Sequence, residues 1–326
     1  MAVSRWRMLR PADAPIPLPS AGMQRVVALV GRVAPTDATV LITGESGVGK
    51  EHVARLVHER SRRSQAPFLA VSCAEFAETL LETELFGHAR GAFTGAVQDR
   101  PGVFEAAGRG TLFLDEVGDV SPALQARLLR VLQTHEVRRV GEVRLRPIDV
   151  RLVAATHRDL AFEVSQGRFR HDLYYRLRVV DVHVPPLRER PGDVAVLMEQ
   201  LLARAASRMA RPIRGYTDEA RRLLLRHDWP GNVRELANAI ERATAVSDGS
   251  LVDAGDLPEA IQRGVVFQPP VHAARPLREV EREYVRLVVR RHGGNRRRAA
   301  EELQISLATL KRKLVDPSHV EPQARF

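Results

Sequence analysis

The 326-residue sequence predicts an α/β domain with a parallel sheet, followed by a helical subdomain and a small all-α unit. From residue 23 to residue 186, short apolar runs alternate with helical patterns, as strands covered on both faces require. From 187 to 263 the apolar residues recur at helical spacing only. The segment from Arg275 to Leu314 contains twelve basic and five acidic residues, so it carries +7 of the net charge of +10. This concentration of positive charge favours a polyanionic partner.

The composition is that of an ordinary globular protein, with 44% hydrophobic and 28% charged residues. No run of about 18 apolar residues is present, so no membrane span is expected. Residues 1–20 contain no apolar core of the kind that a secretory signal needs. The single cysteine, Cys73, excludes an intramolecular disulfide and fits a reducing cytoplasm, the expected location. Its apolar surroundings predict a buried, inert thiol rather than a nucleophile.

The chain is expected to divide into six segments. They are an irregular Pro-rich tail (1–22), the α/β domain (23–186), a helical lid (187–263), a linker (264–276), an all-α unit (277–316) and a tail (317–326). The expected strands of the α/β domain are 39–43, 68–72, 111–115, 150–155 and 179–184.

A glycine-rich loop follows the first of these strands and leads into an expected helix at 51–60. It reads Gly44, Glu45, Ser46, Gly47, Val48, Gly49, Lys50 and Glu51. Strand, glycine loop and helix in this order form a P-loop, in which backbone N–H groups and the helix N-terminus bind the phosphates of a nucleotide such as ATP. Lys50 is expected to reach the β- and γ-phosphates, although the Ser or Thr that usually follows the lysine is Glu51 here.

Two carboxylates end the apolar strand at 111–115. Because ligands of parallel sheets lie beyond the carboxyl ends of the strands, Asp115 and Glu116 are expected to face the phosphates. Asp115 is then the predicted Mg²⁺ ligand, and Glu116 is predicted to polarise the attacking water.

The basic C-terminal segment has the pattern of a helix-turn-helix. Small Ala299 and Ala300 permit close helix packing, and Ser306 is a suitable N-cap for a second helix whose Leu310 and Leu314 face the core. The residues predicted to contact double-stranded DNA are Asn295, Arg296, Arg297, Arg298, Ser306, Thr309, Lys311, Arg312 and Lys313.

The most specific stretch is Gly91, Ala92, Phe93, Thr94, Gly95 and Ala96. It spells the GAFTGA loop of the sigma-54-dependent transcriptional activators, or bacterial enhancer-binding proteins, a branch of the AAA+ ATPases. The sequence resembles this family over about residues 20–262. The resemblance implies that the loop contacts sigma-54 and that the chain is an ATPase that remodels the closed complex of sigma-54 RNA polymerase. In this family the residue after the P-loop lysine is usually glutamate, as it is here.

Further motifs extend the resemblance. Thr156 lies where the family has its sensor I, Arg170 and Arg176 match the segment with its arginine fingers, and Arg234 matches sensor II in the lid. The resemblance implies that Arg170 and Arg176 reach the nucleotide of a neighbouring subunit, so that a homo-oligomeric ring, a hexamer in the family, is needed for hydrolysis. The C-terminal unit resembles the Fis-type DNA-binding domain of the same family.

Three residues depart from the family pattern. Ser72 replaces an asparagine that is thought to hold the catalytic glutamate in an inactive pose, which puts the coupling of hydrolysis to the 91–96 loop in question. Gln304 replaces the turn glycine of the helix-turn-helix, and Leu307 replaces an arginine that could read guanine. The basic residues are still expected to contact DNA phosphates, whereas the DNA sequence that the unit recognises cannot be predicted.

Two other functions fit parts of the sequence. A DNA-acting AAA+ motor, such as a helicase or clamp loader, explains the P-loop and the basic segment but not the GAFTGA letters. A DNA-binding regulator with a purely structural ATPase core conflicts with the intact Lys50, Asp115, Glu116, Arg170 and Arg176. The segment before residue 23 is too short for a receiver, GAF or PAS domain, so control by a separate regulatory protein or by expression level is expected.

Overall fold

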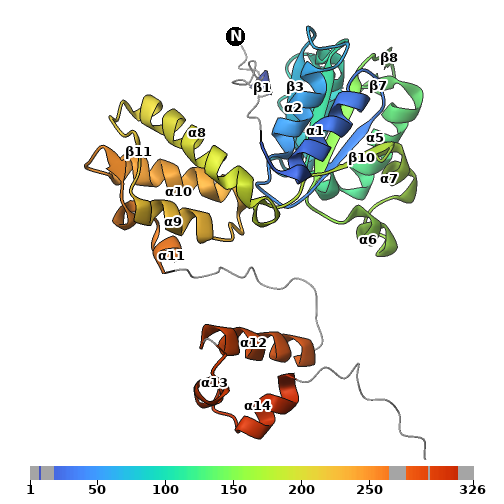
Figure 1. The fold of residues 1–326 in the computed structure, drawn as a ribbon. Coiled ribbons are helices and arrows are strands. Elements are labelled where there is room, and N and C mark those ends of the chain that lie inside the picture. The colour runs from blue at the N-terminus through green and yellow to red at the C-terminus, as the bar shows by residue number, and fades with distance from the viewer. Residues whose placement is uncertain (1–6, 9–17, 264–276, 293, 315–326) are drawn as a thin grey trace, which may run out of the picture. The chain divides into compact units, whose positions relative to one another are not determined.

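The computed structural model describes residues 7–8, 18–263, 277–292 and 294–314 (Figure 1). The expected linker (264–276) and the C-terminal tail (317–326) lie outside the described residues. The chain forms two compact units, residues 1–267 and 268–326, and each is described by itself.

A six-stranded sheet with the order β1-β3-β6-β9-β2-β10 forms the centre of the first unit. Its five long strands are parallel to one another, and β1 pairs with β3 in the antiparallel direction. The strands are β1 (Arg7–Met8), β2 (Val40–Thr43), β3 (Phe68–Ser72), β6 (Thr111–Asp115), β9 (Arg151–Thr156) and β10 (Val180–His183). The five parallel strands match the expected ones within one residue at each end. The expectation of a wholly irregular segment at 1–22 was wrong, because Arg7–Met8 completes the edge of the sheet beside Ala70 and Leu69.

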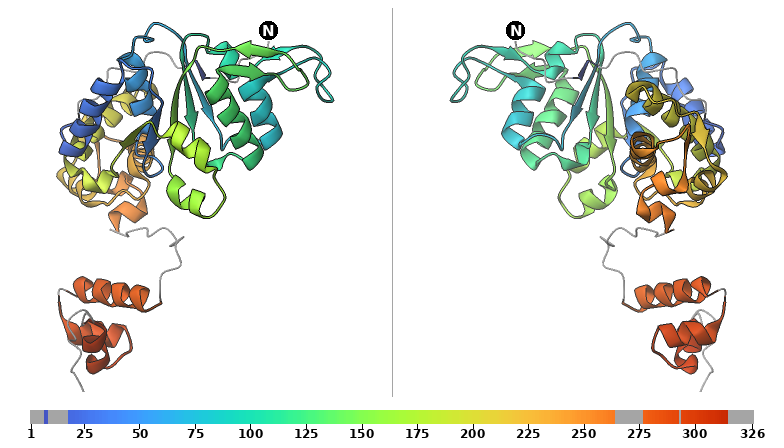
Figure 2. Two further views of the ribbon diagram at one scale, coloured as in Figure 1. Left: turned by 90° about the vertical axis from the view of Figure 1, so that its right-hand side faces the viewer. Right: turned by 90° about the vertical axis from the view of Figure 1, so that its left-hand side faces the viewer.

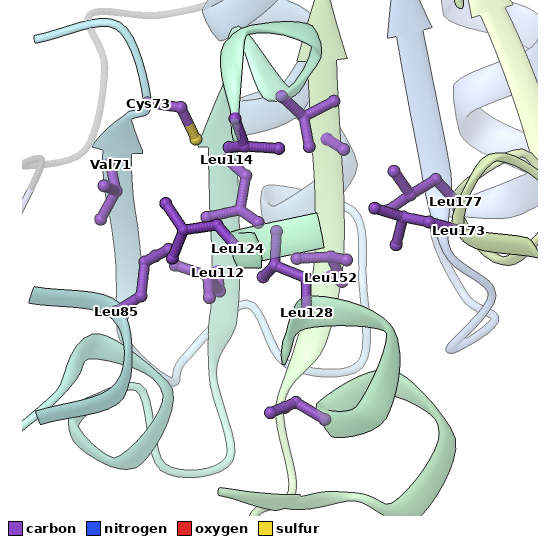
Figure 3. Close-up of a cluster of buried hydrophobic side chains, with 14 of the residues drawn as sticks. Val71, Cys73, Leu85, Leu112, Leu114, Leu124, Leu128, Leu152, Leu173 and Leu177 are labelled. Carbon is purple, nitrogen blue, oxygen red and sulfur yellow. The ribbon is translucent and has the colours of Figure 1, made fainter. Parts of the chain in front are cut away.

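Alternate side chains of each strand enter two separate cores, because successive residues of a strand point to opposite faces. Val40 and Ile42 pack with α1 (Ala21–Val33) and α2 (Lys50–Glu59). Leu41 lies in the core on the other face. Figure 3 shows Leu112, Leu114 and Leu152 of that second core, together with Cys73. Burial raises the pKa of the Cys73 thiol, so the expectation of a buried, inert cysteine is confirmed.

Helices and turns of the second face connect the strands. They are α3 (Glu78–Phe86), α4 (Val103–Ala106), the 3-10 turn Val117–Asp119, α5 (Pro122–Thr134), α6 (Leu160–Ser165) and α7 (His171–Leu177). Two small hairpins also belong to this domain, namely β4 (Gly87–His88) with β5 (Arg100–Pro101), and β7 (Glu136–Arg138) with β8 (Leu145–Pro147).

The lid that follows is mainly helical and packs around the buried Trp229 and Leu236. A two-residue parallel pair, β11 (Gly215–Tyr216) with β12 (Leu251–Val252), interrupts the helical pattern that the sequence predicts. The other lid elements are the 3-10 turn Leu187–Glu189, α8 (Pro191–Met209), α9 (Asp218–Arg226), α10 (Asn232–Val246), the 3-10 turn Ala254–Asp256 and α11 (Glu259–Gln262).

The second unit is a three-helix cluster of α12 (Leu277–Arg291), α13 (Arg296–Glu302) and α14 (Leu307–Leu314). Leu310, Ala299 and Ala300 are buried in its core, as expected. Ser306 precedes α14, and its hydroxyl accepts a hydrogen bond from the Thr309 N–H, so the predicted N-cap is confirmed.

Candidate active site

The glycine loop passes from β2 to α2 with three glycines in backbone conformations that side chains disfavour. The φ angles of Gly44, Gly47 and Gly49 are 146°, 78° and 101°. Lys50 begins α2 and is only 6% exposed, and its Nζ donates to the Gly44 carbonyl (3.0 Å) and the Glu45 carbonyl (3.3 Å). The loop therefore holds an ammonium group at the N-terminus of a helix, which is a suitable site for a phosphate chain.

The start of lid helix α10 lies directly against this loop. The Val233 N–H donates to the Gly47 carbonyl (3.0 Å), and an Arg234 guanidinium nitrogen donates to the Ser46 hydroxyl (2.8 Å). A Cβ at Gly47 would lie 2.5 Å from the Gly231 carbonyl oxygen, so only glycine fits between loop and lid. The structure thus brings Arg234 to the glycine loop, as the family resemblance implies.

Asn232 joins three segments around the loop and is fully buried. Its amide nitrogen donates to the Glu45 carboxylate (3.1 Å) and the Ser46 carbonyl (3.0 Å), and its amide oxygen accepts from the Leu187 N–H (2.7 Å). Arg188 binds the same Glu45 carboxylate through two nitrogens, at 2.8 and 2.6 Å. The hydrogen bonds from Arg188 lower the pKa of Glu45, and Asn232 lowers it further.

A buried ion pair supports the loop from the other side. An Arg190 guanidinium nitrogen donates to the Val48 carbonyl (2.7 Å), and the guanidinium lies 3.8 Å from the carboxylate of fully buried Asp193. The backbone N–H and the hydroxyl of Ser20 both donate to that carboxylate, at 2.8 and 2.7 Å. Residues before α1 are thereby connected to the glycine loop.

The two predicted catalytic carboxylates lie beside Lys50 at the end of β6. Glu116 Oε1 lies 3.4 Å from Lys50 Nζ. Burial and the neighbouring Glu116 charge raise the pKa of Asp115, because two carboxylates disfavour each other's ionisation. Burial also acts on Glu116, but hydrogen bonds from His157 and the Lys50 charge outweigh it, so the pKa of Glu116 is lowered.

Glu116 has a strained backbone and a doubly held side chain. Its φ and ψ angles of 55° and 48° lie in the left-handed region, which costs a non-glycine residue about 1–2 kcal/mol. Its Oε2 accepts from the His157 N–H (3.0 Å) and lies 2.6 Å from His157 Nδ1. The residue that follows the predicted sensor, rather than the sensor itself, therefore contacts the predicted base.

Thr156 lies at the end of β9 and is fully buried. Its hydroxyl accepts a hydrogen bond from the Arg158 N–H (3.0 Å), and Arg158 pairs with Asp119 in the turn after Glu116. Ser72 ends β3 opposite Asp115, and among the described residues no hydrogen bond of its hydroxyl is found. The structure thus places Ser72 next to the carboxylate pair without a contact to Glu116.

The 91–96 loop lies between β4 and β5 and projects beside the β7–β8 hairpin (Figure 2). It closes through a hydrogen bond from the Gly91 N–H to the Ala96 carbonyl (2.9 Å). Phe93 is 46% exposed, although one edge of its ring packs against His88 with 5.0 Å between ring centroids. The Ala89 N–H donates to the Val140 carbonyl (2.9 Å), which joins the loop to the hairpin.

Arg170 directly precedes α7, Arg176 lies in the last turn of α7, and both are exposed. Arg170 pairs with Asp172 (2.8 Å), and Arg176 donates to the Leu132 carbonyl (2.7 Å). Neither contacts the glycine loop of its own chain within the described residues, so the structure keeps both away from the site that the other predicted residues form.

In the second unit, Arg296, Arg297 and Arg298 are exposed at the start of α13. Asn295 caps this helix, since its side-chain oxygen accepts from the Arg297 and Arg298 N–H groups. Thr309 and Lys313 are half-buried; the Thr309 hydroxyl forms a hydrogen bond with the Ser306 hydroxyl (2.8 Å), and Lys313 pairs with Glu281 (2.5 Å). Lys311 is exposed, and Arg312 lies in α14.

Gln304 occupies the turn between α13 and α14 with a φ angle of 52°. This left-handed conformation favours glycine and is costly for a residue with a side chain.

Family models match the chain in three consecutive segments. The models are the Sigma-54 interaction domain (residues 17–183), the AAA+ ATPase lid domain (188–272) and the bacterial regulatory protein, Fis family (276–315). No helix among the described residues is long and apolar enough to cross a membrane.

Relatives and solved structures agree with these matches. The chain is 49% identical to the transcriptional regulatory protein ZraR of Escherichia coli over 295 residues, 90% of this chain and 67% of that protein. It is 53% identical to the Nif-specific regulatory protein of Azotobacter vinelandii over 230 residues, 71% of this chain and 44% of that protein. The crystal structure of NtrX from Brucella abortus with ATP has a TM-score of 0.69 and 35% identity, and covers 94% of this chain and 69% of that one.

Proposed function

This chain belongs to the family of sigma-54-dependent transcriptional activators, and from that membership we propose that it drives promoter opening by ATP hydrolysis within a homo-oligomeric ring. The observation that carries the proposal is the intact GAFTGA loop at 91–96, exposed in the same domain as Lys50, Asp115 and Glu116. Both partners of such an activator, the polymerase and the promoter, are found in the cytoplasm, which we infer as its location.

The ATPase site offers a group for each part of the reaction. Lys50 binds the β- and γ-phosphates, and Glu116 orients a water whose oxygen bonds to the γ-phosphorus as the bond to ADP breaks. The proton of that water passes to the Glu116 carboxylate. Arg234, which belongs to the lid, binds a phosphate of the nucleotide. Thr156, at the end of β9, responds to the presence of the γ-phosphate.

Asp115 has the chemistry that a Mg²⁺ site needs. Oxygen ligands suit this ion, and burial together with the neighbouring Glu116 charge raises the pKa of Asp115, so a divalent cation would stabilise the ionised carboxylate there. When bound, Mg²⁺ neutralises charge on the phosphates. Glu51, where other P-loops have a hydroxyl ligand, pairs with Arg55 (3.0 Å).

A continuous stretch of chain joins the ATP site to the 91–96 loop. Ser72 lies beside Asp115, and α3 follows β3 and leads directly into β4 and the loop. A movement at the ATP site can therefore shift α3 and with it Phe93 and Thr94. This path supports the proposal that hydrolysis repositions the loop against sigma-54.

Arg170 and Arg176 complete the site of a neighbouring subunit in the proposed ring, a hexamer as in the family. Both arginines are exposed, and among the described residues neither contacts the glycine loop of its own chain, which fits this role. Since a trans arginine is worth about 10³–10⁵ in rate, each arginine variant should hydrolyse ATP very slowly.

Mixing two inactive variants tests this arrangement. Lys50→Ala protein lacks a working site but offers its arginines, whereas Arg170→Ala protein has the reverse defect. Random mixing in a ring should restore about a quarter of the wild-type rate, because half the subunits keep a site and half their neighbours keep the arginine. Arg168→Ala, which loses an exposed pair with Glu163, is the control. Full activity of Arg170→Ala alone would refute the role in trans.

We propose that the second unit binds double-stranded DNA, and we assign phosphate contacts to four exposed residues, Arg296, Arg297 and Arg298 at the start of α13 and Lys311 on α14. Replacing Arg297 by alanine should weaken binding to all DNA sequences alike. The slope of log affinity against log salt should fall by about 0.9 for the lost phosphate contact. An unchanged slope would remove Arg297 from the interface.

A further inference from the structure

The carboxylate of Glu116 is held by the residue that follows the predicted sensor Thr156. Glu116 Oε2 receives the backbone N–H of His157 and lies 2.6 Å from its Nδ1, while Oε1 lies 3.4 Å from Lys50. Ser72, at the position where the family has a holding asparagine, makes no such contact among the described residues. Both carboxylate oxygens of Glu116 therefore have a protein partner.

The surrounding turn fixes this arrangement. Arg158 pairs with Asp119, and a Cβ at Gly118 would lie 2.8 Å from the Thr156 hydroxyl, so the turn after Glu116 lies tightly against the end of β9. The left-handed backbone of Glu116 is a strained conformation that such contacts must maintain. Release of the His157 side chain would leave the carboxylate free to turn towards the phosphates.

We propose that His157 is a positioning residue that holds Glu116 in a restrained pose and so limits ATP hydrolysis until the pose is broken. The proposal rests on the role of Glu116 as the water-activating base. His157 directly follows Thr156, the predicted sensor at the end of β9. A change in the γ-phosphate that moves Thr156 would therefore also move His157. In this chain the restraint no longer depends on position 72.

Two features of the restraint explain how it slows the reaction and how it can be released. The contact between Nδ1 and Oε2 fixes the direction of the Glu116 side chain. His157 is 43% exposed, so its side chain has room to leave without disturbing the core.

Steady-state ATP hydrolysis by the full chain tests the proposal. His157→Ala removes Nδ1 but keeps the backbone donor, and kcat should rise about tenfold to a hundredfold, the range expected for one hydrogen bond to a charged group. The KM for ATP should stay within about twofold, because His157 acts through Glu116 rather than on the nucleotide. His157→Asn places an amide donor near the position of Nδ1 and should return kcat to the wild-type value.

Two controls separate the restraint from the role of the base. His183→Ala removes an exposed histidine that contacts Thr43 and not Glu116, and should leave kcat unchanged. Glu116→Gln should lower kcat by at least about a hundredfold. Retained hydrolysis in Glu116→Gln would refute the base, whatever the histidine variants do.

The restraint is refuted if His157→Ala lowers kcat or leaves it unchanged. A decrease that His157→Asn reverses would instead make His157 an aid to catalysis. An increase in Ser72→Ala that equals the one in His157→Ala would likewise overturn the assignment, since it would return the restraint to the end of β3.

Discussion

Replacing Asn232 by alanine should loosen the lid from the glycine loop. Asn232 is fully buried and makes three hydrogen bonds, to Glu45, Ser46 and Leu187. The two neutral bonds contribute about 1 kcal/mol each, and the bond to the Glu45 carboxylate about 1.5–3 kcal/mol. Asn232 also has a φ angle of 55°, which alanine tolerates less well than asparagine. We therefore expect a loss of about 3–5 kcal/mol in the free energy of unfolding.

The measurement is urea unfolding followed by the fluorescence of Trp229, which is 1% exposed in the lid core. The background should carry Trp6→Phe, because Trp6 is the only other tryptophan of the sequence. Asn238→Ala is the matched control, since Asn238 is exposed on the same helix and alanine is the better helix former by about 0.5 kcal/mol. A loss below about 1 kcal/mol for Asn232→Ala, or one equal to the control, would refute the reasoning.

Three further predictions concern other parts of the chain. Because hydrogen bonds from Arg188 lower the pKa of Glu45, their contribution to stability is present above the ordinary pKa of a glutamate and is lost as the pH falls through the lowered pKa. Arg188→Gln should therefore destabilise by about 0.5–1 kcal/mol at neutral pH, and a pH series of urea unfolding should show this difference shrinking at acidic pH. Gln304→Gly should stabilise the second unit by about 1 kcal/mol, seen as slower hydrogen exchange of buried amides in α13 and α14, because the φ angle of 52° suits glycine; faster exchange would contradict this. Gly141→Ala should impair promoter opening while sparing ATP hydrolysis, because the added Cβ would lie 2.7 Å from the Cβ of Ala92. The control Gly167→Ala has a similar φ angle but open space around its Cβ, and it should impair neither activity. Equal effects of the two variants would argue against the contact between loop and hairpin.

The parallel sheet and the glycine loop could be predicted because local patterns determine them. Continuous apolar runs mark strands buried on both faces, and Gly44, Gly47 and Gly49 mark a backbone that only glycine adopts readily. The position of Asp115 and Glu116 beside Lys50 followed from the rule for the carboxyl ends of parallel strands. In each case a few neighbouring residues contain the information.

The contacts that the sequence did not reveal join residues far apart in the chain. His157 meets Glu116 because β6 and β9 are neighbours in register and Glu116 turns left-handed, and neither feature has a local signal. Asn232 and Arg188 meet Glu45 only once the lid has folded onto the loop. The β7–β8 hairpin was missed because its strands have only three residues each, which is too short for an apolar alternation to be recognised.

The most direct test of the account is open-complex formation by sigma-54 RNA polymerase on a supercoiled promoter, with ATP and this protein. Thr94→Ala alters the exposed tip of the 91–96 loop, and Gln98→Ala alters an exposed residue of the same segment outside the hexapeptide. The account predicts that the wild-type and Gln98→Ala proteins open the promoter, while Thr94→Ala hydrolyses ATP at the wild-type rate without opening it. Opening by Thr94→Ala at the wild-type level, or hydrolysis without opening by the wild-type protein, would contradict the proposed coupling.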